Sequence, residues 1–196
     1  MRNYNASDIE SLFNQYEQHV SHVIVAHTHH RPYVASKDEG RFKNVRADQY
    51  LRAKLLETGK DLRHALNCFN KSLYPSHTNR TKQNPYLFRP LTFVTIEGAN
   101  ETTDRANTIH VNIAIGNLPA ALNTEDIEAL FRHAWHEKAH QSSDVKAYEY
   151  SKVDGQSRWM GYSLKEAQQA PKKAWDMDSI WDVGNCWIPH AALKAD

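Results

Sequence analysis

Two apolar runs that alternate with polar residues constrain the fold of this chain more than any other feature of its sequence. They cover residues 91–97 (LTFVTIE) and 108–115 (TIHVNIAI), and a polar connection over residues 98–107 separates them. Side chains of a strand point alternately to its two faces, so residues of one parity share a surface. The spacing therefore predicts an antiparallel hairpin with one apolar face, which the second run forms from Ile109, Val111, Ile113 and Ile115.

The opposite face of the predicted hairpin collects polar groups. Glu97 ends the first run, and His110 and Asn112 share the other parity of the second. A carboxylate, an imidazole and an amide oxygen on one surface are donors that can hold a divalent cation. We expect the three residues to form a metal site. The ordinary alternative is a set of polar residues on the solvated face of a sheet.

The overall composition is that of a single globular domain. The chain has 196 residues, of which 40% are hydrophobic, and this length can bury a substantial core. No run reaches the roughly 18 apolar residues of a membrane span, and the first residues lack the apolar segment of a signal peptide. Cys68 and Cys186 show no metal-binding spacing, which favours free thiols. These features predict a cytoplasmic protein with no membrane partner.

The remaining hydrophobic periodicity predicts an α+β fold. Its centre is an antiparallel sheet of four to five strands, with helices mainly on one face. The other, polar face would then stay open to a ligand. Residues 1–170 form the predicted domain, and residues 171–196 form a tail with three tryptophans that packs on it. The further elements expected are helices over about residues 8–19, 45–73, 123–140 and 157–169, strands over 20–26 and 145–150, and a loop over 74–90.

Charge is distributed unevenly along the chain although the net charge is only +1. Residues 41–90 contain 11 Lys or Arg and 3 Asp or Glu, a local charge of +8, and the rest of the chain carries −7. Such an asymmetry predicts a surface that attracts a polyanion. The ordinary alternative is a solvated basic helix. The candidate DNA-binding residues are Arg41, Lys43, Arg46, Arg52, Lys54, Arg80, Lys82 and Arg89.

A tyrosine and a lysine one helical turn apart add a second motif. Tyr162-Ser-Leu-Lys165 begins 52 residues after His110, on a predicted helix. A strand with a His-hydrophobic-polar motif, preceded by a strand that ends in glutamate and followed by Tyr-x-x-Lys, resembles the HUH endonucleases. The arrangement is most similar to the single-tyrosine replication initiators and transposases, in particular bacterial and filamentous-phage replication proteins. The resemblance covers roughly residues 20–169.

This resemblance implies a metal-dependent DNA endonuclease and strand transferase. Tyr162 would be the nucleophile and Lys165 its cationic neighbour, beside a cation held by Glu97, His110 and Asn112. The implied reaction nicks and rejoins single-stranded DNA through a covalent 5′-phosphotyrosine intermediate. It would start rolling-circle replication, or mobilise a phage, plasmid or other mobile element. The implied substrate is single-stranded or hairpin DNA, and because the chain has no phosphate-binding loop, a helicase would act in trans.

Asn112 departs from the family pattern, in which a second histidine is usual. An amide oxygen can coordinate a hard cation, so the departure favours Mg²⁺ or Mn²⁺ over zinc. It also leaves open a catalytically degenerate DNA-binding module of the same fold. A further alternative is a metal-dependent phosphoesterase that uses His27, His29 and His30. Tyr162 could also be a core aromatic residue.

Overall fold

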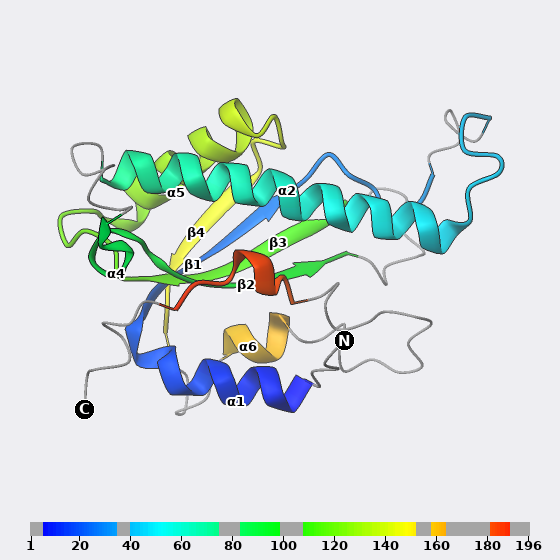
Figure 1. The fold of residues 1–196 in the computed structure, drawn as a ribbon. Coiled ribbons are helices and arrows are strands. Elements are labelled where there is room, and N and C mark those ends of the chain that lie inside the picture. The colour runs from blue at the N-terminus through cyan, green and yellow to red at the C-terminus, as the bar shows by residue number, and fades with distance from the viewer. Residues whose placement is uncertain are drawn as a thin grey trace.

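The fold is built around a four-stranded antiparallel sheet (Figure 1). A computed structural model describes residues 6–34, 40–74, 83–98, 108–151, 158–163 and 181–188. The strands lie in the order β2-β3-β1-β4. Their bounds are Val20–His27 for β1, Leu91–Glu97 for β2, His110–Gly116 for β3 and Val145–Glu149 for β4.

The predicted hairpin is confirmed in both its pairing and its parity. Strands β2 and β3 pair in continuous antiparallel register from Leu91 opposite Gly116 to Glu97 opposite His110. β3 begins two residues later than predicted, but the backbone of Ile109 still bonds to the chain that follows β1, through the N–H of Thr28 and the C=O of His30. The sheet is therefore anchored at the end where the polar residues lie.

The helices differ in detail from the predicted ones. The helix expected over residues 123–140 ends in a six-residue π-helical stretch, and the expected loop over 74–90 contains the short helix α4. The second half of the helix expected over 157–169 lies outside the described residues. None of the described helices is both long and apolar enough to cross a lipid bilayer. The helices are α1 (Ala6–Tyr16), α2 (Ala47–Leu73), α4 (Pro85–Phe88), α5 (Thr124–Arg132) and α6 (Arg158–Ser163), with 3₁₀ turns η1 (Glu17–His19) and η6 (Val183–Asn185) and the π-helical η4 (His133–Lys138).

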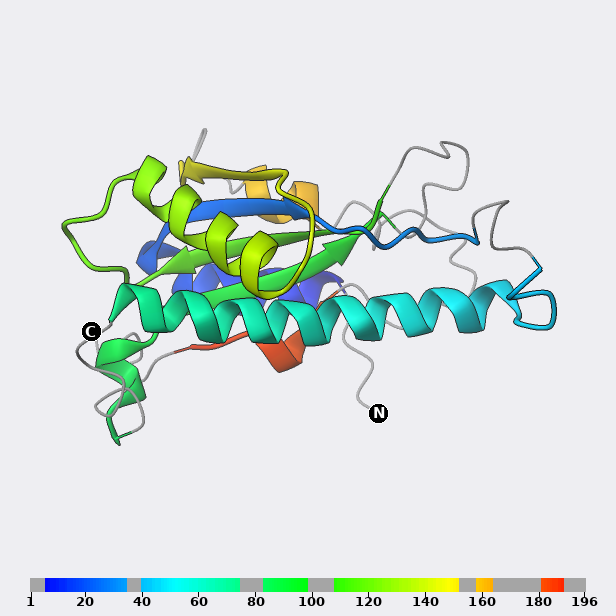
Figure 2. The same ribbon diagram turned by 90° about the horizontal axis from the view of Figure 1, so that it is seen from above.

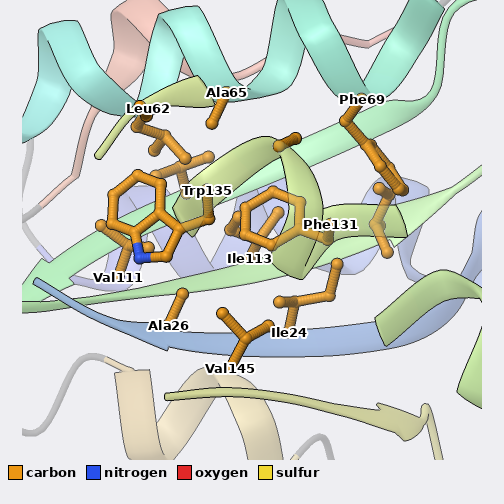
Figure 3. Close-up of a cluster of buried hydrophobic side chains, with 14 of the residues drawn as sticks. Ile24, Ala26, Leu62, Ala65, Phe69, Val111, Ile113, Phe131, Trp135 and Val145 are labelled. Carbon is orange, nitrogen blue, oxygen red and sulfur yellow. The ribbon is translucent and has the colours of Figure 1, made fainter. Parts of the chain in front are cut away.

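The apolar face of the hairpin packs under α2, α5 and η4, as predicted. Leu62 and Phe69 descend from α2, and Phe131 and Trp135 come from α5 and η4; all four are fully buried (Figure 3). Burial of such side chains contributes about 1.5–3 kcal/mol each relative to exposure. The sheet residues that they cover are Val94, Ile96, Val111 and Ile113, each at most 3% exposed.

The expectation that the opposite sheet face is open is wrong. Figure 1 shows α2 and α5 on one side of the sheet and α1 and α6 on the other. Phe93 and Ala114, which share the parity of the polar residues, pack in a second buried cluster with Phe13 of α1 and Trp159 of α6. The polar face is polar at one end only, and its apolar end needs the second layer of helices. The fold thus has three layers.

The described part of the C-terminal tail, residues 181–188, lies along the free edge of β2. Trp187 and Thr92 exchange two backbone hydrogen bonds of 2.8 Å, and Asp182 donates to the carbonyl of Val94. Covering an edge strand removes a row of unpaired backbone groups. Burial raises the pKa of Cys186 in this segment to about 12, so its thiol stays protonated. Cys186 and Cys68 are both free thiols.

Gly116 is required at the end of β3 because there is no space for a side chain. A Cβ atom placed there would overlap the carbonyl oxygen of His19 and lie 2.8 Å from its carbonyl carbon. We expect Gly116→Ala to lower the free energy of unfolding by about 1–3 kcal/mol, as overpacking does. The matched control is Gly161→Ala in α6, where an added Cβ meets nothing within 4 Å. Urea unfolding should show no loss for the control; equal midpoints for the two variants would contradict the crowding at Gly116.

Candidate functional site

The centre of the candidate site is a buried pair formed by Glu97 and His110. The two residues lie opposite each other at the end of the hairpin, and the Nε2 atom of His110 is 3.2 Å from the Oε2 atom of Glu97. The side chain of Glu97 is fully buried and that of His110 is 9% exposed. Burial of a carboxylate is costly unless it is paired. The hairpin register therefore brings together two of the three predicted metal ligands.

Asn112 extends this polar cluster along the same face of β3. It lies opposite Thr95 in the register and is fully buried. Neither amide atom of Asn112, nor the hydroxyl of Thr95, has a hydrogen-bond partner among the described residues. A buried polar group without a partner costs about 1–3 kcal/mol, and such groups in native proteins usually contact a water or an ion. The donors present therefore fit a hard cation with oxygen and nitrogen ligands.

His27 adds an imidazole on the other side of His110. It is opposite His110 in the pairing of β1 with β3, and the two rings stack with centroids 5.1 Å apart at an angle of 28°. Its Nδ1 atom is 3.3 Å from the hydroxyl of Thr108, and its Nε2 atom is 3.9 Å from a carboxylate oxygen of Asp144. The side chain of His27 is 40% exposed. A row of Glu97, His110 and His27 thus runs across three strands from the interior to solvent.

The other two histidines of the sequence cluster belong to a different contact. His30 Nε2 is 3.1 Å from the carboxylate of Asp61 on α2, and Gln141 donates to the same oxygen. The backbone N–H of His29 donates to the side-chain oxygen of Gln141. The structure therefore separates His27 from His29 and His30, which weakens the alternative of a phosphoesterase built on this cluster. Within the described ranges, no three His, Cys, Asp or Glu side chains gather as metal ligands, so a cation site here depends on the amide of Asn112.

Helix α6 lies on the sheet face that bears the polar cluster. Met160 of α6 packs in the same buried cluster as Ala114. Ala114 shares its parity with His110 and Asn112, so all three point to the side of the sheet on which α6 lies. The helix that carries Tyr162 is therefore on the predicted face.

Tyr162 itself is not a core residue. It is 51% exposed, whereas Met160 and Ser163 of the same helix are at most 1% exposed. This excludes the interpretation of Tyr162 as a packing aromatic and leaves its phenol accessible. Lys165 lies outside the described residues.

The predicted DNA-binding residues that the structure describes fall into two separate groups. Lys54 bonds to Glu57 at 2.6 Å, and Arg46 bonds to Asp48. Arg80 and Lys82 lie outside the described residues. The exposed members gather at the N-terminal end of α2 and in the turn before it: Arg41, Lys43, Arg46 and Arg52.

Arg89 is separate from these residues, at the other end of α2 and next to α4 (Figure 1). Its guanidinium lies 4.0 Å from the centroid of the Trp187 ring, and burial lowers its pKa. A cation stacked on an indole in this way stabilises the fold. Arg89 therefore has a local packing partner in the tail, which the sequence pattern did not indicate.

No protein-family model, no curated protein and no solved structure matches this chain. Any function must therefore be argued from the site. The site offers a buried carboxylate–imidazole pair and, beside it, an amide that has no hydrogen-bond partner among the described residues. It also offers a half-exposed histidine, and a helix with an accessible tyrosine lies on the same side of the sheet.

The polar cluster makes a direct prediction about metal binding. We expect His110→Ala to weaken Mn²⁺ binding more than Asn112→Ala, because an amide oxygen is the poorer ligand. Isothermal titration calorimetry with Mn²⁺ alone measures both effects. The control is His64→Ala, an exposed histidine on α2, which should bind Mn²⁺ as the parent does. Equal affinities in all four proteins would contradict a cation site at this place.

Proposed function

We propose that this protein is a metal-dependent endonuclease that nicks and rejoins single-stranded DNA through Tyr162. The observation that supports this most strongly is the buried contact of Glu97 with His110 beside Asn112, whose side-chain amide has no hydrogen-bond partner within the part of the chain that the structure describes. Helix α6, which carries the exposed Tyr162, lies on the same side of the sheet, and the order of these residues along the chain matches the order of motifs in the HUH endonucleases. The biological role would be to start rolling-circle replication or to mobilise a genetic element.

In this proposal each residue has a distinct task. Tyr162 supplies the phenol oxygen that attacks the phosphorus, and Lys165, three residues later, provides a positive charge that favours its ionised form. Glu97, His110 and Asn112 would hold Mg²⁺ or Mn²⁺, which when bound withdraws charge from a phosphate oxygen. The bond from phosphorus to the 3′ oxygen breaks as the bond to the Tyr162 oxygen forms. The phenol gives its proton to solvent and the departing 3′ oxygen takes one from solvent, which leaves a free 3′ hydroxyl.

The exposed end of the row suggests how DNA reaches the site. Glu97 and Asn112 are fully buried, but the row opens to solvent at His27 and Asp144, which are 40% and 62% exposed. A phosphate that approaches from this end meets His27 beside the carboxylate of Asp144. The imidazole of His27 can donate a hydrogen bond to the phosphate, and so would position the scissile group in front of His110.

A non-catalytic DNA-binding module of the same fold is the second candidate. The deep burial of Glu97 and Asn112 favours this candidate, because buried groups are poorly placed to reach a substrate. The buried pair of Glu97 with His110 would then have a structural role only. The two functions differ in one product. An endonuclease of this type leaves a covalent protein–DNA adduct that survives SDS, whereas a binding module leaves none.

The decisive experiment incubates the protein with labelled single-stranded oligonucleotides that form hairpins, with Mn²⁺ and with EDTA. We expect a labelled adduct in SDS gels and a nicked product, both only with the metal. Equal amounts of adduct in EDTA and in Mn²⁺ would contradict a role for the cation in cleavage. Cleavage that leaves no adduct would favour a phosphoesterase, and binding alone would favour the non-catalytic module.

A further inference from the structure

A cluster of basic and aromatic side chains surrounds the N-terminal end of α2. Between Gly40 and Lys54 the sequence contains five basic residues and one acidic residue, Asp48. This segment also carries two aromatic residues, Phe42 and Tyr50. We call the following set the basic-aromatic patch: Arg41, Phe42, Lys43, Tyr50, Arg52 and Lys54.

The two aromatic rings of the patch are paired and flanked by cations. The centroids of Phe42 and Tyr50 are 5.1 Å apart, with the planes at 74°. The guanidinium of Arg41 lies 5.6 Å from the Phe42 centroid, and the ammonium of Lys54 lies 5.8 Å from the Tyr50 centroid. Both rings are only half-buried. In an edge-to-face pair, one ring does not cover the whole face of the other, so flat groups can still stack there.

The patch lies beyond the end of the sheet at which the polar cluster opens. Figure 2 shows the N-terminal part of α2 projecting past the strands. His30, three residues after His27, contacts Asp61, and the carboxylate of Glu57 lies 3.9 Å from its ring. Glu57 in turn bonds to Lys54 of the patch. From Asp61 to Tyr50 the helix extends about 16 Å, so the patch leads away from the place where His30, just after β1, contacts α2.

We propose that the basic-aromatic patch binds single-stranded nucleic acid, with unpaired bases on Phe42 and Tyr50 and phosphates on the surrounding cations. Positive charge alone attracts any polyanion. Half-exposed aromatic rings among the charges distinguish a single strand, because base faces are accessible only where they are unpaired. The direction of the strand, from the patch towards His27, rests on the proposed function; the binding itself does not.

The test measures binding without cleavage. Fluorescence anisotropy in EDTA compares an oligothymidylate of about 16 nucleotides with an abasic strand of the same length and with a duplex. We expect the double variant Phe42→Leu/Tyr50→Leu to bind the oligothymidylate at least about tenfold more weakly. It should bind the abasic strand as the parent does. The matched control is Phe88→Leu, which alters the other half-buried edge-to-face pair, Phe88 with Tyr74, at the far end of α2.

A second variant tests the charges without risk to folding. Arg52 is exposed on α2, and Arg52→Gln should reduce the slope of log affinity against log salt by about 0.7, the value for one phosphate on a single strand. Lys71→Gln, an exposed residue in the last turn of the same helix, should leave the slope unchanged. Equal slopes for Arg52→Gln and the parent would overturn the proposal.

Failure of this proposal and failure of the endonuclease function give different results. If the patch variants bind every strand as the parent does while the parent still nicks DNA, the patch proposal is wrong and the proposed function stands. If the parent never forms an adduct but the aromatic variants lose affinity for oligothymidylate, the patch proposal stands alone. Tighter parental binding to the duplex than to the single strand would overturn the patch proposal.

Discussion

Replacing Tyr162 by phenylalanine should abolish both nicking and the covalent adduct while leaving DNA affinity almost unchanged. The change removes one oxygen from a side chain that is 51% exposed, so packing is hardly affected. The proposed mechanism forms a covalent bond to the phenol oxygen, so no other group of the side chain can replace it. We expect the nicking rate to fall at least about 10³-fold, which corresponds to roughly 4 kcal/mol of activation free energy.

The appropriate control is another exposed tyrosine. Tyr148 on β4 is 53% exposed, nearly the same as Tyr162, and Tyr148→Phe should nick as the parent does. Lys165→Ala should slow nicking without eliminating it, because the cation would supply most of the charge stabilisation. If Tyr162→Phe cleaves at the parental rate, the nucleophile lies elsewhere in the chain.

The hairpin and its parity could be predicted because both follow from local alternation. Val94, Ile96, Val111 and Ile113 point into the core as the two-residue period requires. Parity places Glu97 and His110 on one face of the hairpin, and the observed register sets them directly opposite each other. This part of the site follows from residues that are only 13 positions apart.

The remainder of the site depends on long-range pairing that sequence spacing does not encode. His27 lies beside His110 only because β1, separated from β3 by the whole of α2 and β2, inserts between β3 and β4. The expectation of an open sheet face was wrong although one residue of the sequence argues against it. Phe93 points to the same face as the polar residues, and its large apolar side chain there indicates that a second layer of helices covers this face.

Trp135 connects the core to this long-range part of the site. It is fully buried between the sheet and α2 (Figure 3). Its indole N–H donates to the carbonyl of His27 at 2.7 Å. The π-helical η4 carries this residue, and such stretches are frequent near functional sites. Trp135 therefore both fills the core and fixes the end of β1, where His27 stacks on His110.

Truncation of this side chain should have the largest effect on stability. We expect Trp135→Ala to lower the free energy of unfolding by about 3–5 kcal/mol, through lost burial and the cavity left behind. Trp135→Phe keeps most of the apolar volume but leaves the His27 carbonyl without its donor, a loss of about 1–3 kcal/mol. Urea unfolding monitored by circular dichroism measures both.

A control variant and a nicking assay distinguish the contribution of Trp135 to core packing from its effect on the position of His27. Leu56→Ala removes a side chain of α2 that is 68% exposed, and surface truncations of this kind change stability by less than about 0.5 kcal/mol. If the hydrogen bond to His27 positions the site, Trp135→Phe should also slow nicking under conditions where it remains fully folded. A folded Trp135→Phe protein that nicks at the parental rate would show that the indole acts on stability alone, because its hydrogen bond would then have no effect on the row of Glu97, His110 and His27.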